Sequence, residues 1–143
     1  MTQINPYLNF NGNTEEAFNL YKEVFGGEFE MIMRFADTPG CENMPEVEKN
    51  MIMHVALKIG DNFLMGTDIP ASMEQATFGT NSSISVSVES RAEADRIYNT
   101  LSQDGKVNMP MADMFWGAYY GMLTDRFGVQ WMVSYDEKYA DKV

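Results

Sequence analysis

The chain carries one short pattern twice, and this repeat constrains the fold more than any other feature of the sequence. In both copies a polar residue is followed by Glu-Ala beginning three positions later and by Tyr after eight positions. The copies are Asn13-x-x-Glu16-Ala17-x-x-x-Tyr21 and Ser90-x-x-Glu93-Ala94-x-x-x-Tyr98, offset by 77 residues throughout. A polar residue three positions before Glu is typical of a capping box at a helix start. Because a short alternating strand precedes each copy, the sequence predicts a duplicated β-α-β unit whose sheets enclose a cleft.

The first copy contains both periodicities that such a unit needs. Residues 4–10 alternate with period two, so Leu8 and Phe10 share one face. The next segment has the apolar spacing of an amphipathic helix from Asn13 to Phe25, ended by Gly26-Gly27, and we expect this helix to cover the Leu8/Phe10 face. Further strands are predicted at residues 29–35, 51–59 and 63–67, with a polar, acidic loop at residues 36–49.

The second copy repeats this order. Residues 83–88 alternate between serine and branched apolar residues, and the helix capped by Ser90 ends at Asp104-Gly105. Strands are predicted at residues 106–109, 118–123 and 129–135, with a loop at residues 110–117. The fold class predicted is therefore α+β, with two tandem βαβββ modules, about 1–70 and about 81–143, in a single domain over residues 1–143.

Composition excludes several classes of function. A net charge of −11 repels phosphate backbones and anionic bilayers, so we expect no nucleic-acid partner and no membrane partner. The lone Cys41 offers no intrachain disulfide, which suits a reducing compartment. The N-terminal residues resemble no signal peptide, and no apolar run reaches the length of a membrane span. We therefore expect a cytoplasmic protein.

Several motifs, taken in order, resemble the PhnB-like branch of the vicinal oxygen chelate superfamily, which includes glyoxalase I, bleomycin-resistance proteins and extradiol dioxygenases. The motifs are Asn5-Pro6-Tyr7-Leu8-x-Phe10-x-Gly12, His54-x-x-Leu57-x-Ile59-Gly60-Asp61, Phe115-Trp116-Gly117 and Asp125-x-Phe127-Gly128-x-x-Trp131. The resemblance covers nearly the whole chain. It implies a glyoxalase-like fold, with paired modules curling into a half-open mixed β-barrel around a cavity, commonly completed as a homodimer.

The resemblance also implies where a metal would be bound. Metal-using members carry His or Glu on the first and last strands of each module, and these positions fall on Asn5, Met65, Ser83 and Met132. None of the four is His, Glu or Asp, and a divalent cation needs imidazoles, carboxylates or thiolates. Because the chain has one His, a protomer cannot form a two-histidine site. We expect no metal and no cofactor.

His54 is the candidate for catalysis. The alternation places it with Ala56 on the face opposite the apolar stripe, where an imidazole can act as a general base or as a hydrogen-bonding anchor. The alternative is a partly buried histidine whose ring is satisfied by a neighbouring strand or loop.

The candidate ligand-binding residues are polar, thioether and aromatic side chains expected to face the cavity. They are Tyr7, Asn9, His54, Met65, Ser83, Ser85, Trp116, Tyr120 and Met132. Their alternative roles are ordinary ones: the polar groups can bond one another or face solvent, and the methionines and aromatic rings can pack in the core or a dimer interface.

These features predict a small-molecule-binding protein, with a largely apolar organic ligand held between the modules without a metal. One alternative is an enzyme of lyase, isomerase or dioxygenase type that uses His54 or ligands recruited across the dimer. Another is a drug-sequestering resistance protein of the bleomycin-binding type, in which the acidic chain binds a cationic drug. No Gly-x-Gly-x-x-Gly turn or P-loop is present, so the sequence offers no support for nucleotide or methyl-donor binding.

Overall fold

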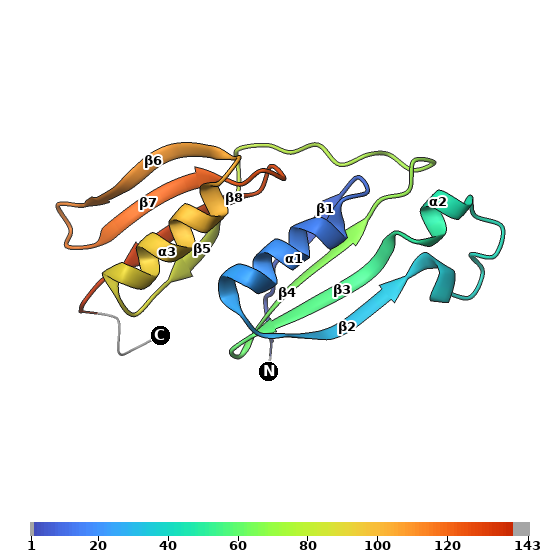
Figure 1. The fold of residues 1–143 in the computed structure, drawn as a ribbon, viewed down its shortest axis with the longest axis horizontal. Helices are drawn as coiled ribbons and strands as arrows, with labels where there is room; N and C mark the ends of the chain where they lie inside the picture. The colour runs from blue at the N-terminus through green and yellow to red at the C-terminus, as the bar shows by residue number, and fades with distance from the viewer. Residues whose placement is uncertain (1, 139–143) are drawn as a thin grey trace. The chain divides into compact units, whose positions relative to one another are not determined.

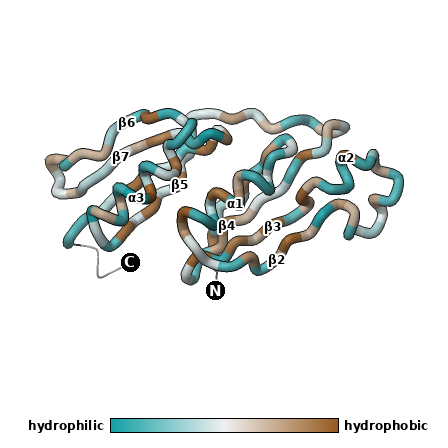
Figure 2. Tube along the Cα trace, in the orientation of Figure 1, coloured by the Kyte–Doolittle hydropathy of each residue, from teal (hydrophilic) through white to brown (hydrophobic). Residues whose placement is uncertain are grey.

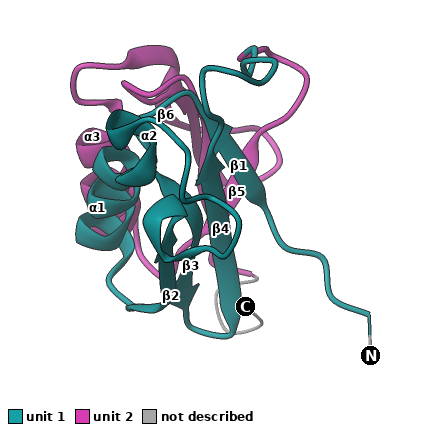
Figure 3. Cartoon of the chain, turned by 90° about the vertical axis from the view of Figure 1, so that its right-hand side faces the viewer, with its two compact units in different colours: residues 1–77 teal, residues 78–143 magenta. Residues whose placement is uncertain are grey.

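A computed structural model describes residues 2–138, which divide into two compact units, residues 2–77 and 78–138 (Figures 1 and 3). Each unit contains one four-stranded mixed sheet and one long helix. These sheets and helices confirm the predicted α+β class. The boundary lies between Thr77 and Phe78, within the segment that the sequence assigned to the connection between modules.

The first unit has the predicted β-α-β-β-β order. Its strand order is β1-β4-β3-β2, with β1 parallel to β4 and the other neighbours antiparallel. The elements are β1 (Tyr7–Phe10), α1 (Thr14–Phe25), β2 (Glu28–Arg34), the 3-10 helix η1 (Phe35–Asp37), α2 (Glu46–Lys49), β3 (Ile52–Ile59) and β4 (Asn62–Asp68). The segment predicted as one long loop therefore contains two short helical turns.

The second unit repeats this topology, with strand order β5-β8-β7-β6 and a parallel β5–β8 pair. Its elements are β5 (Ile84–Ser87), α3 (Arg91–Ser102), β6 (Lys106–Asp113), β7 (Tyr119–Thr124) and β8 (Gln130–Tyr135). The β6 strand runs four residues beyond the predicted end at residue 109 and passes through Pro110. Because β6 is an edge strand, the missing N–H of Pro110 breaks no central ladder.

In the first unit α1 covers one face of the sheet, as the sequence predicts. Phe10 of β1 and Phe18 of α1 are buried and meet edge to face, with ring centroids 6.5 Å apart. A Cβ on Gly66 of β4 would lie 2.7 Å from the Phe18 ring, so only glycine lets the helix approach this closely. Figure 2 shows hydrophobic segments along β2 and β3, whereas the loop around α2 is hydrophilic or neutral.

In the second unit α3 covers the sheet in the same manner. Trp131 and Val133 of β8 are fully buried, as is Leu101 of α3. The Tyr98 hydroxyl of α3 lies 3.0 Å from the carbonyl oxygens of Met109 and Met122, which ties the helix to β6 and β7. Burial raises the pKa of Tyr98, so the phenol stays protonated and can donate to these carbonyls.

The two predicted helix caps differ. Ser90 caps α3 as expected, with its hydroxyl oxygen accepting from the Glu93 N–H at 3.1 Å. The prediction for Asn13 is wrong: its side chain makes no capping bond. The buried Asp68 carboxylate of β4 takes this role, accepting from the Thr14 N–H at 3.0 Å and from the Thr14 hydroxyl at 2.6 Å. A carboxylate 54 residues away in sequence thus caps the helix.

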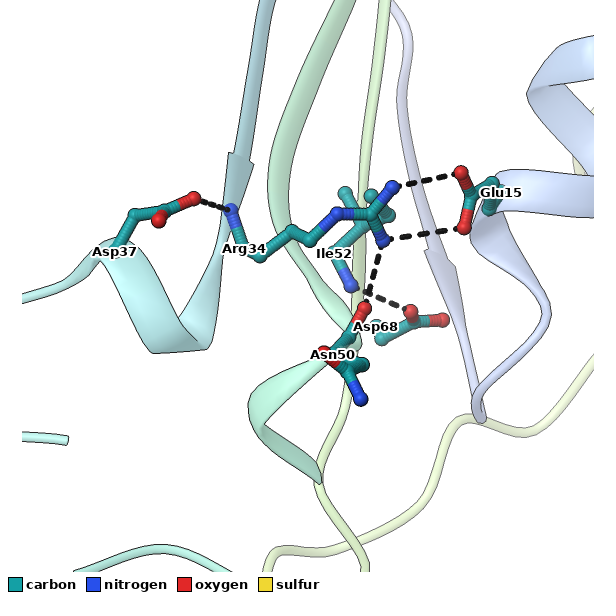
Figure 4. Close-up of polar contacts among 6 residues, drawn as sticks. All are labelled: Glu15, Arg34, Asp37, Asn50, Ile52 and Asp68. Carbon is teal, nitrogen blue, oxygen red and sulfur yellow. Dashed lines mark hydrogen bonds and ion pairs between the residues drawn. The ribbon is translucent and has the colours of Figure 1, made fainter. Parts of the chain in front are cut away.

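Arg34 at the end of β2 links α1 to the segment between β2 and β3 through hydrogen bonds (Figure 4). Its guanidinium makes a forked contact with Glu15, at 3.1 and 2.7 Å, and donates to the Asn50 carbonyl at 2.7 Å. The Arg34 N–H donates to Asp37 at 3.3 Å. The hydrogen bond from Arg34 is the main cause that lowers the pKa of Glu15, with the charge of Arg34 adding to it.

We predict that the Glu15–Arg34 pair stabilises the fold weakly and only where Glu15 is ionised. Because the pKa of Glu15 is lowered by folding, its contribution is present above the unfolded-state value of roughly 4.3 and is lost as the pH falls through the folded-state value. The pair is half exposed, so Glu15→Gln should cost less than about 1 kcal/mol at neutral pH.

Urea unfolding near neutral pH and near pH 3 measures this difference. The neighbouring Glu16→Gln is the matched control, because no ion pair involves Glu16 in the part of the chain that the structure describes. A Glu15→Gln deficit that stays constant with pH would contradict an ionised pair.

Candidate functional site

The face of the first sheet that α1 does not cover collects the predicted site residues of that unit. Met65 on β4 pairs with Tyr7 of β1 on one side and with Ala56 of β3 on the other, so these three side chains share a face. His54 lies two residues from Ala56 on β3 and is opposite Met33 of β2. We call this surface the first open face: Tyr7, Asn9, Met31, Met33, His54, Ala56, Met65 and Thr67.

Tyr7 and His54 are in direct contact on this face. The Tyr7 hydroxyl lies 3.1 Å from Nδ1 of His54, and the rings stack with centroids 5.7 Å apart at 29°. Burial is the main cause that raises the pKa of Tyr7, while hydrogen bonding to Thr67 acts in the opposite direction. The phenol is therefore protonated at neutral pH and is 44% exposed, so the pair is accessible from the open side.

The second sheet has a comparable uncovered surface. Met132 of β8 pairs with Ser85 of β5 and with Met122 of β7, and Ser134 of β8 pairs with Tyr120 of β7. We call this surface the second open face: Ser85, Ser87, Met109, Tyr120, Met122, Met132 and Ser134. It carries hydroxyls and thioethers without a formal charge.

An aromatic cluster borders the second open face at the β6–β7 turn. Trp116 packs edge to face against Phe115, with centroids 5.0 Å apart, and against Tyr120, with centroids 5.9 Å apart. Phe115 is 98% exposed and Trp116 is 50% exposed. These rings therefore present apolar surface outward rather than filling the core of their own unit.

Tyr119 shows the opposite orientation to its neighbour Tyr120. Its hydroxyl donates to Asp95 of α3 at 2.6 Å, and the Arg91 guanidinium lies 3.9 Å from its ring centroid. The hydrogen bond to Asp95 raises the pKa of Tyr119. Since Tyr119 is engaged on the helix side, Tyr120 is the tyrosine of this strand that can reach a ligand on the second open face.

The residues present do not fit a divalent metal. Within residues 2–138 no group of three or more His, Cys, Asp or Glu side chains comes together. Met65 and Met132 lie on the open faces, and thioethers are poor ligands for hard or borderline divalent cations. Asn5 and Ser83 precede β1 and β5, and Ser83 is exposed.

The structure therefore brings the predicted site residues together in two groups. Tyr7, Asn9, His54 and Met65 share the first open face, and Ser85, Tyr120 and Met132 share the second, with Trp116 against Tyr120. Ser83 belongs to neither group of paired residues. Their roles in binding a ligand remain predictions, as does convergence of the four positions that the resemblance gave as metal sites.

Sequence reasoning missed several residues of the first open face and one contact on it. Thr67 and Met33 were not among the predicted residues, although β4 alternation places Thr67 beside Met65 and the β2–β3 register places Met33 opposite His54. The Tyr7–His54 contact was also missed. This contact can be predicted only from the strand order and register of the sheet, because β1 and β3 are both neighbours of β4.

Comparisons with known proteins match this architecture. A family model described as 3-demethylubiquinone-9 3-methyltransferase matches residues 2–134. Protein YjdN of Escherichia coli (strain K12) is 29% identical over 140 residues, which is 92% of this chain and 93% of that protein. The crystal structure of protein PA1353 from Pseudomonas aeruginosa has a TM-score of 0.86 and 43% identity, over 95% of this chain and 98% of that one.

Two further solved structures extend the likeness. A Bacillus cereus protein, described as a putative 3-demethylubiquinone-9 3-methyltransferase, PhnB protein, has a TM-score of 0.78 and 28% identity, over 94% of this chain and 99% of that one. A glyoxalase-related enzyme from Fulvimarina pelagi has a TM-score of 0.64 at 13% identity, over 95% of this chain and 89% of that one. The second match concerns the fold alone and confirms the predicted glyoxalase-like fold.

We predict that the two sides of β8 differ in their importance for stability. Val133 is fully buried against α3, so Val133→Ser should lower the free energy of unfolding by about 2–3 kcal/mol through lost apolar burial and a buried hydroxyl. The adjacent Met132→Ser, on the open face, should cost about 1 kcal/mol or less. Urea unfolding of both variants tests the difference, and an equal loss would show that the open face is part of the core.

Proposed function

Because the chain belongs to the family described as 3-demethylubiquinone-9 3-methyltransferase, we propose that it binds a small, largely apolar organic molecule on its open sheet faces without a divalent metal. The observation that carries this proposal is the first open face. There a stacked phenol and imidazole stand among methionine side chains on a sheet surface that the helix of its own unit leaves uncovered.

The chemistry of the open faces supports an apolar, uncharged ligand. Ligand sites are lined mostly by apolar and aromatic groups, with a few polar groups that fix orientation. The first open face has this composition: its methionines supply adaptable apolar surface, and Tyr7 and His54 supply hydrogen-bonding groups. The residues that define the two open faces include no carboxylate, which favours a neutral ligand over a cationic drug; the same register continues to Lys58 and its partner Glu28 at the end of the first sheet.

The family description names a methyltransferase, and the residues of this chain give that activity no support. The sequence has no glycine-rich turn of the kind that holds a nucleotide-like methyl donor at a helix start. Each long helix instead begins at a polar residue or at a buried carboxylate. We therefore propose ligand binding and leave methyl transfer out of the function.

We also propose that the protein works as a homodimer in the cytoplasm. Apolar side chains exposed on the outer strands, outside the residues that define the open faces, support association with a second copy: Ile32 of β2 is 49% exposed and Val107 of β6 is 51% exposed. None of the helices within residues 2–138 combines the length and the apolar character needed to cross a membrane.

The Tyr7–His54 contact also favours a second candidate function, proton transfer in a lyase or isomerase. An imidazole oriented by a hydroxyl at hydrogen-bonding distance can act as a general acid or base. In that case His54→Ala abolishes turnover of any substrate that the protein converts. Unchanged turnover in this variant would remove the second candidate and leave ligand binding intact.

We predict that native mass spectrometry of freshly purified, tag-free protein detects a dimer that retains a small organic molecule, with far less than one divalent metal per subunit. The retained molecule should survive treatment with a chelator. Met65→Glu should abolish retention, because it places a charge among the methionines of the first open face. Met73→Glu is the matched control, since Met73 is 61% exposed and lies outside both open faces.

Two outcomes would contradict the proposal. A stoichiometric zinc, nickel, iron or manganese ion that is needed for retention would show that the site uses a metal after all. Equal retention in Met65→Glu and in the unaltered protein would place the ligand elsewhere.

A further inference from the structure

The hydrogen bond between Tyr7 and His54 can be formed in two ways, and the choice decides what the imidazole offers to a ligand. A neutral imidazole has one N–H donor and one acceptor nitrogen. If the Tyr7 hydroxyl donates to Nδ1, the ring proton lies on Nε2. If Nδ1–H donates to the phenol oxygen, Nε2 becomes an acceptor.

The groups around the pair favour donation by Tyr7. A phenol hydroxyl is a good donor and its oxygen a weak acceptor, whereas the unprotonated imidazole nitrogen is a strong acceptor. The phenol keeps its proton, since burial raises the pKa of Tyr7.

We infer that Tyr7 is a positioning residue that holds His54 in the Nε2–H form, so that the first open face donates a hydrogen bond to an uncharged oxygen acceptor, such as a carbonyl, on an otherwise apolar ligand. This inference rests on the proposed function and names the ligand class of the same site. Methionines adjoin His54: Met33 is its direct cross-strand neighbour, and Met31 and Met65 flank Ala56, the next residue of the same face. Such surroundings favour a ligand with few polar atoms.

The tautomer can be measured without any ligand. His54 is the only histidine of the chain, so tag-free protein labelled with ¹⁵N-histidine gives the signals of one imidazole. Spectra recorded over a series of pH values identify the neutral ring by its one pyrrole-type and one pyridine-type nitrogen. We expect Nε2 to give a pyrrole-type signal and Nδ1 a pyridine-type signal shifted by its hydrogen bond.

Two variants test the role of Tyr7. Tyr7→Phe keeps the ring but removes the donor, so the Nδ1 signal should move and the two tautomers should begin to average. Tyr119→Phe is the matched control, because it removes the same hydroxyl from a tyrosine that contacts Asp95 instead of His54, and it should leave the tautomer unchanged. A protonated Nδ1 in the unaltered protein, or identical spectra for the Tyr7→Phe variant and the unaltered protein, would overturn the inference.

A matched pair of probes tests the ligand class. Acetophenone and ethylbenzene have similar shapes, and only acetophenone has a carbonyl acceptor. We expect the ratio of their affinities to shift against acetophenone by about three- to tenfold in His54→Phe, the loss of one neutral hydrogen bond. The Nε2 signal of the unaltered protein should move with acetophenone and stay in place with ethylbenzene.

The outcomes separate this inference from the proposed function. If both probes bind with a ratio that His54→Phe leaves unchanged, the inference fails and apolar ligand binding stands. If neither probe binds, the result counts against both. If only the tautomer differs from expectation, the role of Tyr7 is wrong while the open face still takes an apolar ligand.

Discussion

Packing of a single helix against a single face of each sheet is the constraint on which the rest of the structure depends. Phe18 of α1 lies so close to Gly66 of β4 that a Cβ would meet its ring at 2.7 Å, and Trp131, Val133 and Leu101 are buried between β8 and α3. Each unit therefore builds its core on one side of its sheet. The other side of each sheet does not pack against the helix, so it can carry hydroxyl, imidazole and thioether groups.

The duplicated fold supports two open faces that have diverged in chemistry. The first open face has the paired rings of Tyr7 and His54, and the second has serines, methionines and the tyrosine that contacts Trp116. The repeat is thus a property of the backbone and the core, whereas the polar groups differ between units.

The local sequence predicted most of the architecture because its periodicities record which side of each element is buried. The alternation of β1, the apolar stripe of α1 and the Ser90 cap were each predicted from a few adjacent residues. The cap of α1 was not, because the acceptor is Asp68 on β4, and no local pattern around Asn13 indicates it. The length of β6 was also missed, since Pro110 is tolerated at a sheet edge that only the strand order defines.

The sequence predicted which side of each strand the site residues occupy, but it did not predict which of them are in contact. Alternation placed Tyr7 and His54 on uncovered sides of their strands, whereas their hydrogen bond depends on β4 lying between β1 and β3 in one register. Pairing of this kind links residues 47 positions apart and follows from the tertiary fold. The methionine surroundings of His54 come from the same register.

The central claim is that the open faces bind ligand while the helix-covered faces hold the fold together. Methyl spectra of protein labelled at methionine, recorded with and without an apolar carbonyl compound, test it most directly. We expect the methyl signals of the open-face methionines to move: Met33, Met65, Met122 and Met132. The signal of Met111 should stay in place, because its sulfur lies beside Gly121 on the side of the sheet that faces Tyr98 of α3. Movement confined to Met111 and other residues away from the open faces would contradict it.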